Sequence, residues 1–149
     1  MINDILEKIY LHRKRARMAM SEIQGWGEID SEVFEDFEKI KTVDTFIYRF
    51  IKLQDMMGDK LFRIFLDAIG EYKDDMSLLD VLDKLEKLEI IPHGEEWMMY
   101  RKLRNKLTHE YPNNEEEIVE GIKISIEVFS DIETILANIE AYKNSHNIN

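Results

Sequence analysis

The sequence predicts an all-α fold: an up-and-down bundle of five to six helices forming a single domain over residues 1–149. Three observations predict it. Apolar residues recur every three or four positions along most of the chain. Glycine and proline stand where these periodic segments end. No segment alternates in the manner of a strand, and no repeat or long linker divides the chain.

The N-terminal half is expected to contain three helices. The first covers residues 2–23 and ends at Gly25, Trp26 and Gly27. A short second helix is expected to begin at Asp30 or Ser31. Its apolar positions are Val33, Phe34, Phe37 and Ile40. A third helix is expected to begin between residues 42 and 44, to end at Gly70 and, being apolar on more than one face, to lie at the centre of the core.

Several residues inside this central helix are unusual for a core position. Gly58 costs about 1 kcal/mol relative to alanine, which indicates close packing or a bend. Arg49, Asp55 and Arg63 are charged, and buried charges are usually paired. Two interpretations remain open for them. They form an internal Asp–Arg bridge, or Asp55 faces a functional cleft and orients another side chain.

Three further helices are expected in the C-terminal half. Ser77 and Asp80 have the spacing of a capping box, and the helix that they begin ends at Pro92. The next helix begins near Trp97 and ends before Pro112. Asn114 with Glu117 repeats the capping spacing ahead of a final helix whose apolar positions run to Ile139.

Composition limits the function classes. The chain has no cysteine, so disulfides and thiolate chemistry are excluded. Its formal net charge of −11 argues against a protein that coats nucleic acid, because such proteins are usually basic. No basic segment followed by an apolar run marks a signal peptide, and no apolar stretch reaches the roughly 20 residues of a membrane span. We expect a cytoplasmic protein with no membrane contact.

Two short basic segments run against the overall acidity, His12 to Arg17 and Arg101 to Lys106. A charge run is usually a solvated helix face. The alternative hypothesis is that both segments bind RNA locally. The candidate RNA-binding residues are Arg13, Lys14, Arg17, Arg101, Lys102 and Lys106.

The second basic segment leads into a pair of residues suited to RNA cleavage by the 2′-hydroxyl. His109 can transfer a proton near neutral pH, and Arg104 can stabilise charge on the scissile phosphate. This chemistry requires no metal or other cofactor, and the four histidines show no His-x-x-x-His spacing. On a continuous helix the two side chains would point about 140° apart. They converge if the helix ends near Thr108, or if two chains contribute one pair each. By spacing alone, His109 is a C-terminal helix cap.

The residues from Arg104 to Tyr111, RNKLTHEY, resemble the R-x4-6-H signature of HEPN domains. They are most similar to the R-x4-H-x-Y form of HepT-like toxins and of the partners of minimal nucleotidyltransferases, in which Asn follows the Arg. The motif is the specific part of the resemblance. Because the expected helical bundle and long central helix also agree with this family, the resemblance covers most of the chain.

The resemblance implies a homodimer with both motifs in one cleft, acting as a metal-independent endoribonuclease. Arg104 and His109 would be catalytic, with Asn105 as a supporting residue. A cognate minimal nucleotidyltransferase antitoxin would transfer AMP to Tyr111 and obstruct the cleft. Without the resemblance, Tyr111 is a half-buried aromatic residue. Two alternatives remain: a non-catalytic subunit that binds a nucleotide or substrate for a separate nucleotidyltransferase, and a helical bundle without a site.

Overall fold

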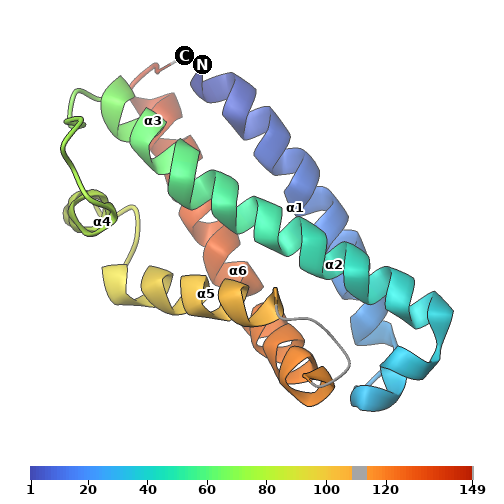
Figure 1. Ribbon diagram of the computed structural model, residues 1–149. Coiled ribbons are helices and arrows are strands. Elements are labelled where there is room, and N and C mark those ends of the chain that lie inside the picture. Colours follow the sequence, from blue (N-terminus) through green and yellow to red (C-terminus); the bar gives the residue numbers. More distant parts are fainter. Residues whose placement is uncertain (109–113, 149) are drawn as a thin grey trace.

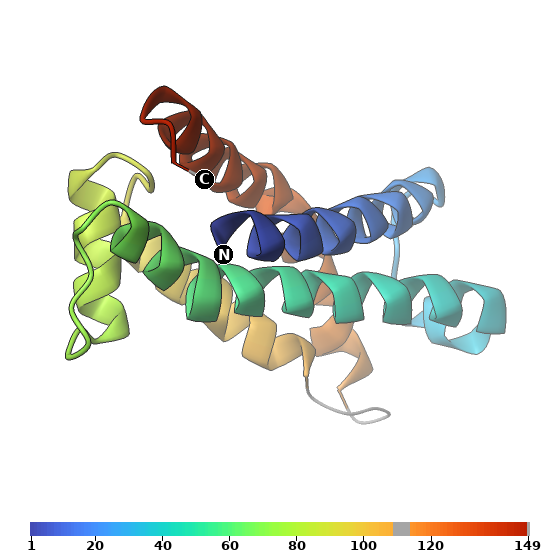
Figure 2. The ribbon, with the colours of Figure 1, turned by 90° about the horizontal axis from the view of Figure 1, so that it is seen from above.

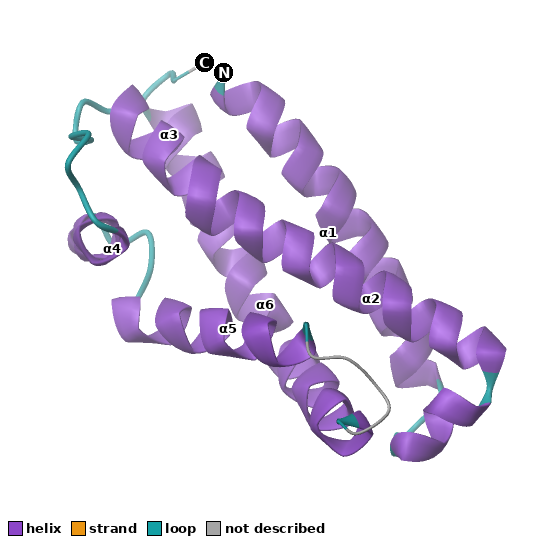
Figure 3. Ribbon diagram, viewed as in Figure 1, coloured by secondary structure: helices purple, strands orange, loops and turns teal. Residues whose placement is uncertain are grey.

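A computed structural model describes residues 1–108 and 114–148, and every regular element within these ranges is helical (Figures 1 and 3). The elements are α1 (Ile2–Gly25), η1 (Ser31–Glu35), α2 (Phe37–Met56), η2 (Met57–Leu61), α3 (Phe62–Ala68), α4 (Leu78–Lys87), α5 (Gly94–Leu107) and α6 (Glu115–Ser145). The predicted all-α helical bundle is confirmed.

The long helices lie side by side, and the chain reverses direction from one to the next (Figures 1 and 2). α1 and α2 are antiparallel neighbours. η2 and α3 continue α2 without interruption, and the three together form one long rod, α2–η2–α3. α6 returns behind them and packs on α5. α4 is seen end-on in Figure 1 and joins the end of the rod to α5. This arrangement leaves α2 between α1 and α5, so α2 connects the two basic segments of the sequence.

The second helix begins where the sequence predicts, at Ser31, whereas the third begins earlier than predicted. The short second helix is a single 3₁₀ turn, η1, whose N-terminal cap is the Asp30 side chain. α2 then begins at Phe37, because the Asp36 side chain accepts a hydrogen bond from the backbone N–H of Glu38. The predicted start at residues 42–44 is therefore wrong. Phe37 is 68% exposed and lies outside the core to which its spacing had assigned it.

Gly58 marks a change of helix type in the middle of the rod. η2 is a π-helical turn, with a backbone hydrogen bond from Phe62 N–H to the carbonyl of Met57. A Cβ at Gly58 would lie 3.1 Å from Nε1 of Trp97, so the glycine permits close approach of α5. π-turns inside α-helices are frequent at functional sites. The sequence-based expectation of close packing at Gly58 is confirmed.

Of the two N-terminal caps predicted for the later helices, one forms as predicted and one does not. Ser77 and Asp80 form the predicted capping box, with hydrogen bonds of 3.1 and 3.0 Å. Asn114 is the N-cap residue of α6, but its side chain makes no capping hydrogen bond. Gly70 has a φ of +79° just after α3, where a side chain would be strained.

Aromatic and aliphatic side chains from all the long helices fill the core. Its largest fully buried members are Trp97, Phe46, Phe50, Phe62, Phe65 and Phe129. Gln54 and Ser125 are the polar exceptions among the described residues. No helix within 1–108 and 114–148 is both long and apolar enough to cross a membrane.

Candidate functional site

Arg104 and Asp55 form a bidentate ion pair between α5 and α2. Nε and Nη2 of Arg104 donate to the two carboxylate oxygens of Asp55, each at 2.9 Å. Both side chains are about two-thirds buried, with exposed fractions of 32% and 34%. Asp55 thus pairs with an arginine of α5, and neither Arg49 nor Arg63 of the central helix is its partner. Arg49 and Arg63 bind other partners, His12 and the pair Tyr72 and Met76.

The ion pair fixes the plane of the guanidinium and leaves part of it available. Nη1 of Arg104 also donates to Oδ1 of Asn105 at 3.3 Å. A guanidinium carries five N–H groups. Three are used in these bonds, so two have no acceptor among the residues that the structure describes. The hydrogen bonds that Arg104 donates to Asp55 raise the pKa of the guanidinium, so it stays cationic. A planar, oriented pair of donors suits a phosphate oxygen.

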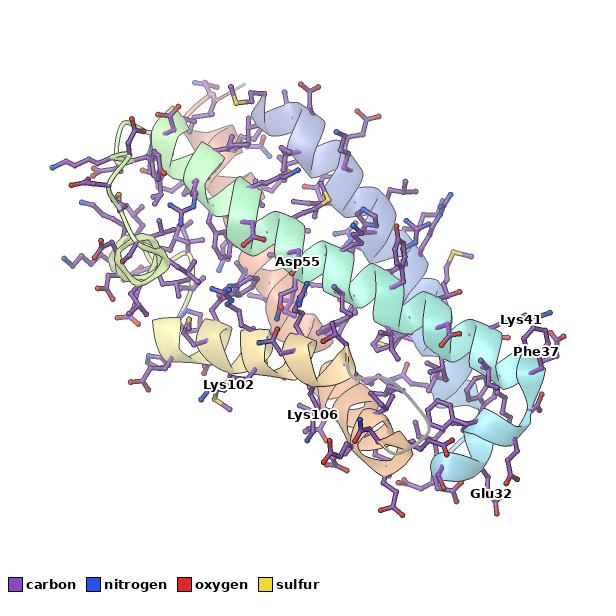
Figure 4. The ribbon with its side chains drawn as sticks, viewed as in Figure 1. Glu32, Phe37, Lys41, Asp55, Lys102 and Lys106 are labelled. Carbon is purple, nitrogen blue, oxygen red and sulfur yellow. The ribbon has the colours of Figure 1, made fainter. Side chains whose placement is uncertain are left out.

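A small cavity of about 180 Å³ lies against this pair, where α2 and η2 face α5. Figure 4 shows Asp55 on the face of the rod that is turned towards α5. The cavity is lined by Gln54, Asp55, Gly58, Asp59, Leu78, Trp97, Arg101, Arg104 and Asn105. Two cations and two carboxylates therefore border it, and their formal charges cancel.

Two buried donors at the cavity lack an acceptor within residues 1–108 and 114–148. Nε2 of Gln54 and Nε1 of Trp97 have no hydrogen-bond partner in these ranges, although the two residues are only 2% and 1% exposed. The Trp97 ring packs against Phe62 at 4.7 Å and Tyr100 at 5.9 Å between ring centroids, so it cannot turn to find one. An unsatisfied buried donor costs about 1–3 kcal/mol. A ligand that brings hydrogen-bond acceptors into the cavity would offset this cost.

The structure brings together some of the predicted site residues and separates others. Arg101, Arg104 and Asn105 line the cavity, one turn apart or adjacent on α5. His109 and Tyr111 lie outside the described residues. Lys102 and Lys106 are each two positions from Arg104, so their side chains point roughly 200° around α5 from it. Figure 4 shows both on the side of α5 away from Asp55.

The predicted RNA-binding residues of α1 are also dispersed. The guanidinium of Arg13 lies over the Tyr10 ring, 4.9 Å from its centroid. Arg17 forms an ion pair with Glu133 on α6, which raises the pKa of Arg17. Lys14 borders a shallow depression with two carboxylates, Asp4 and Glu7. None of the three lines the cavity beside Arg104, and their contact with RNA stays a prediction.

Sequence reasoning missed Gln54, Trp97 and Asp59 as members of the site. Gln54 and Trp97 fall at apolar positions of their helices, where the periodic pattern assigns them to the core. The available signal was Gly58, a helix-weakening residue in an otherwise strong helix. It marks the π-turn, and the polar lining of the cavity gathers around that turn.

Within residues 1–108 and 114–148, no group of three or more His, Asp or Glu side chains has the arrangement of a metal site. Comparison with protein-family models, with curated proteins and with solved structures finds no match for this chain.

Proposed function

We propose that the protein is a metal-independent endoribonuclease that acts as a homodimer. One observation carries the proposal: Asp55 orients the guanidinium of Arg104 beside a donor-lined cavity, with two N–H groups left for a phosphate. The sequence places His109, a proton-transfer residue, five positions later. The resemblance of RNKLTHEY to the HEPN motif joins these two residues in one reaction.

In the proposed reaction the 2′-oxygen of a ribose attacks the adjacent phosphorus. His109 accepts the 2′-hydroxyl proton and then returns it to the departing 5′-oxygen, so the proton balance closes. The products are a 2′,3′-cyclic phosphate and a 5′-hydroxyl end, so no water or metal is consumed in this step. Arg104 donates to the phosphoryl oxygens, where negative charge develops in the transition state. In the dimer, each protomer contributes one Arg104–His109 pair to the cleft.

We further propose that the protein is the toxin of a HEPN/nucleotidyltransferase pair. A cognate minimal nucleotidyltransferase would transfer AMP to Tyr111. The adduct would add bulk and negative charge to the cleft, and both oppose the binding of an RNA phosphate. Support for this step comes from the position of Tyr in the R-x4-H-x-Y motif.

A second candidate function uses the same cavity without cleavage. The cancelling charges of its lining and the two unpartnered donors favour a small, polar, acceptor-bearing group. The protein would then bind a nucleotide or a substrate for a separately encoded nucleotidyltransferase. The Asp55–Arg104 ion pair leaves the cavity with little net charge, which suits a polar group of low charge.

The decisive experiment is cleavage of a mixed RNA pool in EDTA by protein whose Tyr111 is shown to be unmodified by mass spectrometry. We expect wild type and His146→Ala to cleave, and His109→Ala to be inactive. His146 is a suitable control because it bonds locally at the end of α6, to Ser145 and the Tyr142 carbonyl. Cleavage products should carry 2′,3′-cyclic phosphate ends.

If neither wild type nor His146→Ala cleaves, the ribonuclease proposal fails. Nucleotide binding measured on the same sample by calorimetry would then support the binding subunit. Absence of both activities, with a monomer by light scattering, would leave a helical bundle without a site.

A further inference from the structure

Four cationic or titratable side chains of α1 and α2 meet on one face of the molecule. Nη1 of Arg49 lies 3.0 Å from Nδ1 of His12. Burial lowers the pKa of His12, and the charges of Arg49, Lys52 and Arg15 lower it further. His12 is therefore neutral at neutral pH, but Arg15, Arg49 and Lys52 are three cations gathered around it, and such a cluster is unusual in a chain with a net charge of −11. A bound polyanion would relieve the repulsion among these cations.

An exposed aromatic ring lies among these cations. The side chain of Tyr48 is 53% exposed. The Arg49 guanidinium lies 5.2 Å from the ring centroid, and Nζ of Lys52 lies 5.7 Å from it. The two cations lie beside the ring, and its exposed part is accessible to a stacking partner. A ring flanked by cations is the arrangement on which single-stranded nucleic acids stack their bases.

A groove between α1 and α2 extends from the same residues towards the start of α2. Arg15, Lys41 and Arg49 line it, together with the carboxylate of Glu22. That carboxylate already accepts a hydrogen bond of 2.8 Å from Thr42. Lys41, labelled near the start of α2 in Figure 4, pairs with Glu38 outside the groove. The lining of the groove therefore has a net positive charge, which Arg15 and Arg49 supply.

The geometry of α2 joins these cations to the candidate site. Tyr48, Lys52 and Asp55 occupy positions i, i+4 and i+7 of one helix, so they follow each other along one face. Lys52 lies one turn from Asp55, and Tyr48 lies about 10 Å from it along the axis. A strand that stacks one base on Tyr48 and pairs a phosphate with Lys52 is thereby directed to Arg104.

We propose that the face formed by His12, Arg15, Arg49, Lys52 and Tyr48, the α1–α2 basic face, binds single-stranded RNA and leads it to Arg104. The choice of RNA as the natural ligand rests on the proposed ribonuclease function. The binding chemistry rests on the face alone. The exposed ring selects single strands, because bases in a duplex are already stacked on each other.

The test is binding of a fluorescently labelled, fully 2′-O-methylated RNA strand, followed by anisotropy over a range of salt concentrations. Without a free 2′-hydroxyl the strand cannot be cut, so binding is measured separately from cleavage. The variant is Arg15→Ala/Lys52→Ala, which preserves the Arg49–His12 contact. The charge-matched control is Lys73→Ala/Lys87→Ala, because these lysines border a depression on α4 among carboxylates such as Glu71 and Asp83.

We expect the first variant to bind at least about tenfold more weakly at low salt, and to lower the slope of log K against log salt by about 1.4. The control should bind as wild type does. Tyr48→Ala should weaken binding by about five- to a hundredfold, and Tyr48→Phe should restore it, because the ring is what stacks. Unchanged circular dichroism melting checks that each variant is folded.

Equal binding by the two double variants would overturn the proposal, as would equal affinity of wild type for a duplex or an acidic peptide. The outcome is separable from the ribonuclease test. If the protein binds the methylated strand through this face but never cleaves RNA, the α1–α2 basic face is supported and the ribonuclease proposal fails. If the protein cleaves RNA while both double variants bind alike, the ribonuclease proposal is supported and the role of the α1–α2 basic face fails.

Discussion

Asp55 holds Arg104 through two parallel hydrogen bonds of 2.9 Å, and the two residues are 49 positions apart in the chain. The contact joins the central rod to α5, the helix that carries the motif. A bidentate pair restricts both the position and the plane of the guanidinium. The orientation of Arg104 is therefore set by a residue outside the motif, and Asp55 is a positioning residue for the proposed reaction.

Asp55→Asn is expected to lower single-turnover RNA cleavage by about a hundredfold, because a displaced catalytic group costs about that factor. The amide retains one acceptor but loses the charge and the second hydrogen bond. Asp67→Asn on α3, an exposed carboxylate away from the cavity, should cleave as wild type does. If Asp55→Asn and Asp67→Asn cleave at equal rates, Asp55 does not position Arg104 for reaction.

Gln54→Leu is expected to increase the free energy of unfolding by about 1–2 kcal/mol in the absence of ligand. The substitution removes a buried donor that has no acceptor and keeps similar volume. Gln24→Leu supplies the control, because Gln24 is exposed near the end of α1 and should change stability little. Urea denaturation measures both variants.

The same Gln54→Leu variant should bind its substrate more weakly or cleave it more slowly, because Gln54 lines the cavity and the variant lacks its amide donor. A variant that gains stability and loses function would identify Gln54 as a residue kept for ligand binding. Loss of stability in Gln54→Leu would show instead that the amide has a structural partner.

Gly58→Ala is expected to lower the free energy of unfolding by up to about 2 kcal/mol. The added methyl would lie 3.1 Å from Nε1 and 3.3 Å from Cζ2 of Trp97, whose ring is fixed by Phe62 and Tyr100. Overpacking costs about 1–3 kcal/mol, which exceeds the gain of about 1 kcal/mol in helix propensity. At Gly25 a Cβ has no neighbour within 4 Å, so Gly25→Ala is the matched control.

Thermal or urea unfolding should show a loss of stability for Gly58→Ala and none for Gly25→Ala. Equal stabilities for the two alanine variants would mean that α5 can move away from the π-turn without cost. The position of Trp97, and hence the width of the cavity, would then be adjustable.

His12 is expected to make stability depend on pH. Its folded-state pKa is lowered, first by burial and then by Arg49, Lys52 and Arg15. The unfolded chain therefore binds a proton near pH 6.5 while the folded protein does not, and stability decreases as the pH falls below that value. Urea unfolding between about pH 7.5 and about pH 5.5 should show wild type losing stability relative to His12→Gln. Parallel pH profiles of the two proteins would contradict the cluster of cations around His12.

The sequence predicts the all-α bundle because local rules decide most helix ends. The capping box of Ser77 and Asp80 and the stop after Ala68 both depend on neighbours within a few residues. Local rules also explain the error at the start of α2. Asp36 caps a helix that begins with the exposed Phe37, and an apolar residue at that position gives no signal of a helix start.

Only the tertiary structure decides which residues meet at the candidate site. The motif identifies Arg104 and Asn105, but Asp55, Gln54 and Trp97 join them because η2 and Gly58 allow α2 and α5 to approach closely. Likewise, the basic segment of α1 reads as one charged run, yet Arg17 pairs with α6 while His12 and Arg15 gather with Arg49 and Lys52 of α2. Helical periodicity determines which face a side chain occupies, whereas the packing of one helix on another determines its partners.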